Sequence, residues 1–376
     1  MLKFENVSKT YHDGTQAVKS MNFEIQQGEF IVFIGPSGCG KTTTMKMINR
    51  LIPHTEGTIS IKGRDINQEN LVELRRNIGY VIQQGGLFPH YTIEENISLV
   101  PQLKGWKAAK RKERAQELMQ MVGLEPSKFA ARYPRELSGG QQQRVGVARA
   151  LAADPEIVLM DEPFGALDPI TREQLQDELI RLQKTLNKTI VFVTHDMDEA
   201  LKLADRIAVM KDGVLLQLDT PEKLLREPEH GFVETFIGKN RIFRNPEFIS
   251  IQEIMRENPA TATPSLSPAR ALSLMRQRRT DTLLVGDEEG KLIGIVSAYD
   301  LQAHMNDIYS IQEICVPVDP FLEQSATAQD ALIAITNAKF GIIPVIGERK
   351  KIVGVVTRSS LLTAFADQWA GKKVET

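Results

Sequence analysis

The sequence predicts an α/β domain followed by a smaller α+β region, and three observations support this fold class. Residues 30–34 form a continuous apolar run that ends in a glycine-rich loop, which is typical of a strand buried on both faces of a parallel sheet. Similar runs at 157–160, 189–193 and 206–210 alternate with segments of helical periodicity, and this alternation favours an α/β core. The third observation is a unit of about 60 residues that occurs twice after residue 246.

The other elements of the first region follow from local patterns. Residues 1–25 alternate between apolar and polar positions around a turn at 12–14, which predicts antiparallel strands. Residues 104–122 and 138–153 have helical periodicity and predict helices of an inserted, mostly helical lobe. Glycines and prolines interrupt the pattern near 228–246, so we place a domain boundary there.

The repeated unit predicts a pair of modules. Residues 285–301 align with residues 345–361, and each unit is expected to run helix, strand, turn, strand, helix. Two copies are too few for a solenoid, so the modules are expected to bury a shared face. The predicted domains are residues 1–240, then a first module at 246–308 and a second module at 309–370.

Composition excludes several classes of protein. The 376 residues contain 46 Lys and Arg against 48 Asp and Glu, a net charge of −2, and no basic domain of the kind that binds nucleic acid. Two cysteines, Cys39 and Cys315, exclude a disulfide framework and fit a reducing cytosol. No apolar stretch approaches the roughly 20 residues that span a bilayer, and the charged N-terminal segment does not predict a signal peptide.

The loop after the first buried strand has the pattern G-x-x-x-x-G-K-[ST], which binds phosphate. Its glycines let backbone N–H groups point inward, and the following helix adds the partial positive charge of its N-terminus. We expect Lys41 to reach the β- and γ-phosphates of a nucleotide and Thr42 to bind Mg²⁺. The residues expected to contact the nucleotide are Gly35, Pro36, Ser37, Gly38, Cys39, Gly40, Lys41, Thr42 and Thr43.

Two acidic residues end the strand predicted at 157–160. Asp161 is expected to hold Mg²⁺, and Glu162 to orient and deprotonate the attacking water. The alternative is an ordinary Asp-Glu pair at the start of a helix, which the nearby phosphate loop disfavours.

A second anion site is predicted at the start of the helix at 138–153. Its residues are Ser138, Gly139, Gly140 and Gln141 of the segment LSGGQ. Two phosphate-binding helix ends in one domain are explained if the second serves the nucleotide of a neighbouring molecule. This interpretation predicts a head-to-tail homodimer with two ATP molecules at the interface.

Residues 1–240 resemble the ATP-binding subunits of ATP-binding-cassette (ABC) transporters through an ordered set of motifs. The resemblance implies a P-loop NTPase cassette with a RecA-like core, an antiparallel β subdomain and a helical subdomain. It also implies that Tyr11 stacks on adenine, that Gln83 senses the γ-phosphate and binds Mg²⁺, that Asp168 lies in the D-loop, and that His195 is the switch histidine. Alternatives remain for three of these: Tyr11 as a turn aromatic, a one-residue shift from Gln83 to its neighbour, and a structural role for His195.

The ABC resemblance implies partners. The activity is ATP hydrolysis coupled to transport, and a separate integral membrane permease contacts the surface at residues 87–97. An extracellular substrate-binding protein belongs to the same system. The chain is then expected at the cytoplasmic face of the membrane as a peripheral subunit.

The tail resembles a pair of cystathionine-β-synthase-type (CBS) modules through LIGIVSAYDL and KIVGVVTRSSL. A cassette with this tail is similar to the ATPases of importers for glycine betaine, carnitine and choline, some of which bind cyclic di-AMP. Candidate ligand residues are Thr282, Thr357 and Arg358; the ribose-binding Asp of such modules is Asp300 in the first repeat and is replaced by Ser360 in the second. Two alternatives are a tail that only dimerises and a sensor of anionic lipid, and the latter lacks a polybasic segment.

Two further functional classes stay open. One is an importer of another substrate such as an amino acid, because the ATPase never touches what is carried. The other is an ABC ATPase outside transport, which the single cassette and the lack of heptad repeats disfavour.

Overall fold

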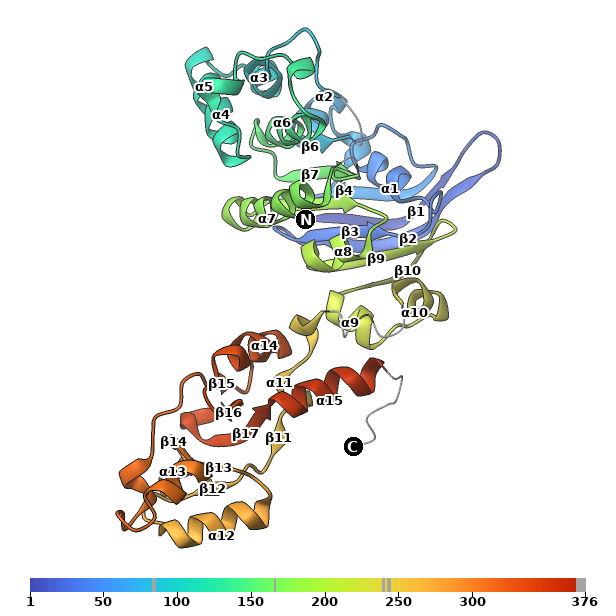
Figure 1. Cartoon of the computed structure of the whole chain (residues 1–376). Helices are drawn as coiled ribbons and strands as arrows, with labels where there is room; N and C mark the ends of the chain where they lie inside the picture. Colours follow the sequence, from blue (N-terminus) through green and yellow to red (C-terminus); the bar gives the residue numbers. More distant parts are fainter. Residues whose placement is uncertain (83–85, 166, 239–240, 242–244, 370–376) are drawn as a thin grey trace. The chain divides into compact units, whose positions relative to one another are not determined.

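The computed structural model describes the chain except residues 83–85, 166, 239–240, 242–244 and 370–376, and it describes no side chains for 366–369. It divides into two units, Met1–Ile237 and Gly238–Thr376. Figure 1 shows the chain coloured along its sequence. Among the described residues, none of the helices combines the length and the apolar character that a membrane crossing requires.

The core of the first unit is a six-stranded sheet in the order β10-β9-β3-β8-β7-β6. All neighbouring strands are parallel except β10, which is antiparallel to β9. Its strands are β3 (Phe30–Ile34), β6 (Ile78–Val81), β7 (Ile157–Asp161), β8 (Thr189–Val193), β9 (Arg206–Lys211) and β10 (Val214–Asp219). Every residue of β3, β7 and β8 is buried, as their continuous apolar sequences predict.

A second, antiparallel sheet has the order β2-β1-β4-β5. Its strands are β1 (Leu2–Thr10), β2 (Gln16–Ile25), β4 (Glu56–Ile61) and β5 (Arg64–Asp65). The predicted antiparallel pairing within residues 1–25 is confirmed. The rings of Phe4 and Phe23 are stacked, with 4.3 Å between their centroids. The ring of Phe23 also makes an edge-to-face contact with Phe33 of the six-stranded sheet, with 5.6 Å between centroids. One apolar core therefore joins the two sheets.

Helices complete the first unit, and most of the helical lobe lies between β6 and β7 in the chain. The helices are α1 (Lys41–Ile48), α2 (Leu71–Arg76), α3 (Ile93–Leu103), α4 (Ala108–Met121), α5 (Pro126–Phe129), α6 (Gly139–Leu151), α7 (Pro169–Leu186), α8 (Met197–Leu203), α9 (Pro221–Arg226) and α10 (Gly231–Ile237), with 3₁₀ turns at Ile66–Gln68 and Pro134–Glu136. The helix expected from residue 104 begins only at Ala108, because Gly105 adopts a φ of +74° after α3 ends. α3, which contains Pro101, was not predicted from the sequence.

The second unit contains two similar modules, each built from helix, strand, strand, helix as expected. The first comprises α12 (Pro268–Arg278), β13 (Thr282–Gly286), β14 (Leu292–Ser297) and α13 (Ala298–Ala303). The second comprises α14 (Ala328–Asn337), β16 (Ile342–Ile346), β17 (Ile352–Thr357) and α15 (Arg358–Trp369). Shorter elements are η4 (Pro246–Phe248), α11 (Ile251–Ile254), β11 (Arg256–Glu257), β12 (Thr261–Ala262), η5 (Ile311–Ile314), β15 (Leu322–Glu323) and η6 (Glu348–Lys350).

One strand pairing in this unit was not predicted. β11 lies near the start of the first repeated unit, before α12, but pairs with β17 of the second module, in a sheet of order β11-β17-β16-β15. The other sheet, β12-β13-β14, belongs to the first module. This pairing connects the start of the first repeated unit to the sheet of the second module.

We expect substitution of one central aromatic residue to destabilise the first unit strongly. Phe192 on β8 is fully buried, and its ring lies 5.8 Å from Phe30 and 5.4 Å from Phe164. Phe192→Ala should lower the free energy of unfolding by about 3–5 kcal/mol, measured by denaturant titration followed by circular dichroism. The control Val72→Ala, at a half-exposed position of α2, should change it by less than about 0.5 kcal/mol. Equal effects of the two variants would contradict this assignment of the core.

Candidate functional site

The phosphate loop joins β3 to α1 and needs glycine at two positions. At Gly35, with a φ of +154°, a Cβ would lie 2.1 Å from the carbonyl oxygen of Met210. At Gly40, with a φ of +103°, a Cβ would lie 2.3 Å from the carbonyl oxygen of Ala17. Both contacts are with backbone atoms, so only glycine fits. The tip of the loop, residues 36–38, is exposed.

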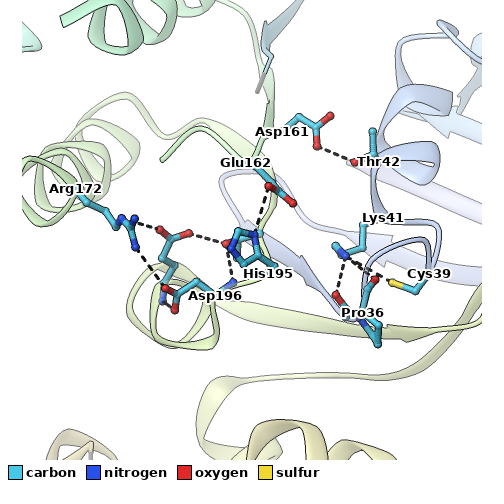
Figure 2. Close-up of polar contacts among 12 residues, drawn as sticks. Pro36, Cys39, Lys41, Thr42, Asp161, Glu162, Arg172, His195 and Asp196 are labelled. Atoms are coloured by element: carbon cyan, nitrogen blue, oxygen red, sulfur yellow. Dashed lines mark hydrogen bonds and ion pairs between the residues drawn. The ribbon is translucent and has the colours of Figure 1, made fainter. Parts of the chain in front are cut away.

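The first turn of α1 leaves backbone donors available. Gly40 occupies the N-cap position, where no side chain caps the helix. Lys41 is buried, and its Nζ donates to the carbonyl oxygens of Gly35 at 2.7 Å and Pro36 at 3.0 Å (Figure 2). Backbone N–H groups and a lysine ammonium at a helix N-terminus together form an anion-binding site.

Cys39 is a packing residue of this loop. Its side chain is buried, and burial raises the pKa of its thiol. Its Sγ lies 3.8 Å from Nζ of Lys41. A raised pKa keeps the thiol protonated at neutral pH, which fits a small packed side chain and not a nucleophile.

Asp161 and Thr42 meet beside the loop. Thr42 Oγ1 donates to Asp161 Oδ1 at 2.9 Å, although 119 residues separate them in sequence. Asp161 is buried at the end of β7, and burial raises the pKa of its carboxyl group, while the bond from Thr42 lowers it. A hydroxyl and a carboxylate are ligands that Mg²⁺ accepts alongside phosphate oxygens, so these residues fit that ion. Among the described residues, no group of three or more His, Cys, Asp and Glu side chains is arranged to hold a metal ion by itself.

Glu162 and His195 lie together at the same edge of the sheet. Glu162 Oε2 is 3.4 Å from Nδ1 of His195, whose side chain is 67% exposed (Figure 2). Glu162 has a φ of +44°, a left-handed conformation that costs a non-glycine residue about 1–3 kcal/mol. Its N–H donates to the carbonyl oxygen of Val193 at 2.9 Å, which holds this conformation against β8. Glu162 thus has a left-handed backbone fixed against β8 and a carboxylate beside His195.

Glu162 and His195 also line a small cavity. Its lining residues are Glu162, Gly165, Arg172, Thr194, His195, Asp196 and Glu199. Arg172 and Glu199 were not predicted from the sequence. The available signal was weak: each is a charged residue in the first turn of a helix that follows a buried strand. Burial raises the pKa of Glu199, although a hydrogen bond from Thr194 opposes this shift.

Tyr11 contacts the phosphate loop from the antiparallel sheet. Its hydroxyl lies 3.4 Å from Oγ1 of Thr43, and its ring is partly exposed. The Nζ of Lys9 lies 5.2 Å from the centroid of the ring. An exposed aromatic face beside the loop offers a surface on which a base can stack.

The predicted second anion site is separate from the first. Ser138 caps α6, and its Oγ accepts a hydrogen bond from the N–H of Gln141 at 3.3 Å. A cavity of about 520 Å³ is lined by Ser138, Gly139, Gly140, Gln141 and Asp168, together with Arg144, Thr171 and four apolar or glycine residues. Asp168 caps α7 by accepting from the N–H of Thr171 at 3.0 Å. The structure thus brings Asp168 to the second site and not to Lys41. Gln83, the remaining predicted site residue, lies outside the described residues.

The second unit contains a cavity of about 600 Å³ between its two modules. Thr282 and Thr357, two of the candidate ligand residues, line it. Arg276 and Arg279 also line it and were not predicted, and Asp281 adds a negative charge. Arg358 is not among the lining residues, and its guanidinium lies beside Gly341.

Asp300 and Ser360 lie in the first turn of the helices that follow β14 and β17, and their N–H groups donate to the residues that cap these helices, Ser297 and Thr357. Ser297 Oγ donates to Asp300 Oδ2 at 2.7 Å and accepts from the Asp300 N–H at 3.1 Å. In the second repeat, Ser360 Oγ accepts from the N–H of Thr357 at 2.9 Å, and Thr357 Oγ1 accepts from the N–H of Ser360 at 2.9 Å. Neither Asp300 nor Ser360 lines the cavity.

The chain matches two family models. Residues 18–165 match the model described as ABC transporter. Residues 251–307 and residues 311–367 each match the model described as CBS domain. The first match spans the phosphate loop and Asp161, and the other two correspond to the repeated units.

Several curated proteins are similar over nearly the whole chain. The carnitine transport ATP-binding protein OpuCA of Listeria monocytogenes is 52% identical over 98% of this chain and 92% of its own length. The glycine betaine/carnitine/choline transport ATP-binding protein OpuCA of Bacillus subtilis is 50% identical over 98% of this chain and 97% of its own length. The choline transport ATP-binding protein OpuBA of the same organism is 51% identical over 99% of this chain and 98% of its own length.

A solved structure has the fold of the first unit. The dimeric post-hydrolysis state of the ATP-binding cassette MJ0796 bound to ADP and Pi is 40% identical, with a TM-score of 0.55 over 59% of this chain and 99% of that chain. The predicted fold class, a nucleotide-binding cassette followed by a CBS pair, is therefore confirmed.

We expect the buried carboxylate of Asp161 to cost stability when no cation is present. Because burial raises its pKa, the folded protein holds the Asp161 proton more tightly than the unfolded chain does. The ionised group therefore destabilises the fold at neutral pH, and this effect is lost as the pH falls through the folded-state pKa. Asp161→Asn, measured without nucleotide or divalent cation, should raise the melting temperature at neutral pH, and its advantage should shrink toward acid.

Asp13→Asn is the matched control for this experiment. Asp13 is exposed, and a hydrogen bond from the N–H of Thr15 lowers the pKa of its carboxyl group, so neutralising it should not raise the melting temperature. A lower melting temperature for Asp161→Asn than for the unmodified chain at neutral pH would contradict the prediction.

Proposed function

The chain belongs to the ATP-binding subunits of ABC transporters and hydrolyses ATP in support of transport, and we propose that it energises the uptake of quaternary-amine osmoprotectants. The observation that carries this proposal is the full-length similarity, which includes the CBS pair, to proteins named for transport of carnitine, glycine betaine and choline. An importer for another substrate, such as an amino acid, is the alternative, because no residue of an ATPase subunit contacts what is carried.

In the proposed mechanism the phosphate loop and the first turn of α1 bind ATP. Lys41 exchanges its bonds to the carbonyl oxygens of Gly35 and Pro36 for the β- and γ-phosphates. The N–H groups of the first turn of α1 bind the same phosphates, and Tyr11 stacks on the adenine. Since these groups are already in place, binding requires little rearrangement of the fold.

Thr42 and Asp161 are proposed to hold Mg²⁺, together with Gln83. When bound, Mg²⁺ supplies positive charge that offsets the charge of the transferring phosphoryl group. Glu162 accepts a proton from the attacking water and is held in position by its strained backbone. His195, 3.4 Å from Glu162, donates a hydrogen bond toward the γ-phosphate.

The second anion site is proposed to act on the nucleotide of the neighbouring subunit. Ser138 and the N–H groups of Gly139 and Gly140 lie at the start of α6, in a cavity separate from Lys41. In a head-to-tail homodimer, Ser138 of the partner subunit would complete each ATP site. The dimeric assembly of a cassette 40% identical to this chain supports this arrangement.

The chain is proposed to act at the cytoplasmic face of the membrane, bound to integral membrane permease subunits. Residues 87–97, which include the exposed Phe88 and the start of α3, are the proposed contact surface. A substrate-binding protein outside the cell would select the osmoprotectant. Because another subunit selects the substrate, the residues of the ATP site do not indicate which substrate is carried.

The CBS pair is proposed to regulate transport by binding cyclic di-AMP in the cavity between the modules. Arg276 and Arg279 provide charge for phosphate groups, and Thr282 and Thr357 provide hydroxyl groups. Asp281 opposes an anion, so the two arginines must outweigh it. Arg358 lies beside Gly341, the residue before β16, whose first residue Ile342 lines the cavity, and it is a further candidate once a ligand is bound.

We expect Glu162→Gln to slow ATP turnover by about 100-fold or more, because the amide cannot accept the proton of the attacking water. ATP binding should persist, so the variant should elute as an ATP-dependent dimer in size-exclusion chromatography. Glu113→Gln, at an exposed position of α4, is the control and should keep normal turnover. Undiminished hydrolysis by Glu162→Gln would reject the proposed role.

Labelled cyclic di-AMP should bind the full chain saturably. Arg276→Gln should weaken this binding by about tenfold or more, because it removes a charged hydrogen-bond donor from the cavity. Arg278→Gln, two residues away on the same helix and not lining the cavity, should bind like the unmodified chain. Absence of saturable binding to the unmodified chain would end this proposal and leave the ATPase assignment unaffected.

A further inference from the structure

A partly buried charge network lies next to His195 and joins two loops that follow neighbouring strands. Residues 194–196 follow β8, and residues 167–168 follow β7 and lead into α7. Arg172 in the first turn of α7 and Glu199 in the first turn of α8 are the charged residues that connect them. None of the roles proposed above uses this pair.

Glu199 fixes Thr194, the residue before His195. Glu199 is 6% exposed, and its Oε2 accepts a hydrogen bond from Thr194 Oγ1 at 2.6 Å. Thr194 is itself buried, and its N–H donates to the carbonyl oxygen of Phe33 at 3.2 Å. The backbone before His195 is therefore held by its neighbour on β3 and by the buried carboxylate.

Asp196 fixes the other side of His195. Its N–H donates to Thr194 Oγ1 at 3.0 Å, and its Oδ1 accepts from the N–H groups of Asp198 and Glu199 at 2.8 and 3.3 Å. His195 thus lies between two anchored residues while its own ring is mostly exposed. The ring position depends on these anchors more than on contacts of the ring.

Arg172 connects this loop to the segment before α7. Its Nη2 donates to the carbonyl oxygen of Leu167 at 3.2 Å. Its Nη1 lies 3.6 Å from Asp196 Oδ2, and its Nε lies 3.7 Å from Glu199 Oε1 (Figure 2). Within the part of the chain that the structure describes, Nε is buried and makes no hydrogen bond, so the guanidinium balances two carboxylates mainly by charge.

We propose that Arg172 and Glu199 are positioning residues that set the place of the His195 imidazole relative to Glu162. Through Leu167, the same pair couples that placement to Asp168, which lines the second anion site. A displacement of the segment at Asp168 is then transmitted to His195 within one subunit. This inference rests on the role of His195 in the proposed function.

The first test compares ATP turnover of Glu199→Gln and Arg172→Met in the full chain with and without His195→Ala. Glu199→Gln keeps an acceptor for Thr194 but loses the charge that Arg172 balances, and Arg172→Met removes the guanidinium. In the unmodified background each should lower kcat about 10- to 100-fold, with KM for ATP changed by less than about twofold, because the phosphate loop is untouched. In the His195→Ala background neither should reduce the residual single-turnover rate further.

The control uses another ion pair between the same two helices. Lys202 on α8 pairs with Asp177 on α7 at 2.8 Å, away from the loop that carries His195. Lys202→Met should leave kcat within about twofold of normal. If it lowers kcat as much as Glu199→Gln does, the effect is general helix packing and the proposal is wrong.

A second measurement does not depend on residual activity. The chain has six histidines, so the side-chain nitrogen signal of His195 can be assigned by its absence in His195→Ala. That signal should shift in Glu199→Gln and in Arg172→Lys, whereas the other five signals should stay in place, and Lys202→Met should move none. An unmoved His195 signal in both variants would overturn the inference, as would further loss of activity in the His195→Ala background. Normal turnover by His195→Ala would instead reject the proposed role of the histidine.

Discussion

The site depends on the register of three parallel strands. Val193 at the end of β8 pairs with Phe33 of β3 on one side and with Asp161 of β7 on the other. Parallel strands in register end at one edge, so the segments that follow them meet there despite their separation in sequence. The hydrogen bond between Thr42 and Asp161 is a direct result of this register. A slip of one strand by one residue would turn each of its side chains to the opposite face of the sheet and separate the phosphate loop from its acidic partners.

The edge is built with uncompensated features that a nucleotide would relieve. Lys41 bonds to carbonyl oxygens of its own loop, α1 begins without a side-chain cap, and the buried carboxyl group of Asp161 has a raised pKa. Glu162 adds a strained backbone. The buried carboxyl group and the strained backbone cost stability in the free protein. Under the proposed function, a phosphate at the uncapped start of α1 and a cation at Asp161 would stabilise the edge. The fold can carry this cost because the strands beneath, including β3 and β8, are completely buried.

Residues in short contiguous motifs were predictable from the sequence, and residues that act across elements were not. The phosphate loop and Asp161 follow from a glycine pattern and an apolar strand, which are local properties. Arg172 and Glu199 acquire their meaning only when α7 and α8 pack side by side, and no spacing in the sequence encodes that contact. The pairing of β11 with β17 was missed for the same reason, since it joins residues about 100 apart. Gln83 stays a prediction.

The second module shows how a motif can be preserved in structure while its residue changes. Sequence comparison of the repeats suggested that Ser360, standing for Asp300, weakens a ribose contact. In the structure both residues lie in the first turn of the helix that follows their strand, and the N–H of each donates to the Ser or Thr three residues earlier, which caps that helix. A hydroxyl-bearing residue caps the helix in both repeats, so the change from Asp to Ser preserves the helix start. Since neither residue lines the cavity between the modules, the substitution leaves the set of arginine and threonine groups there unchanged.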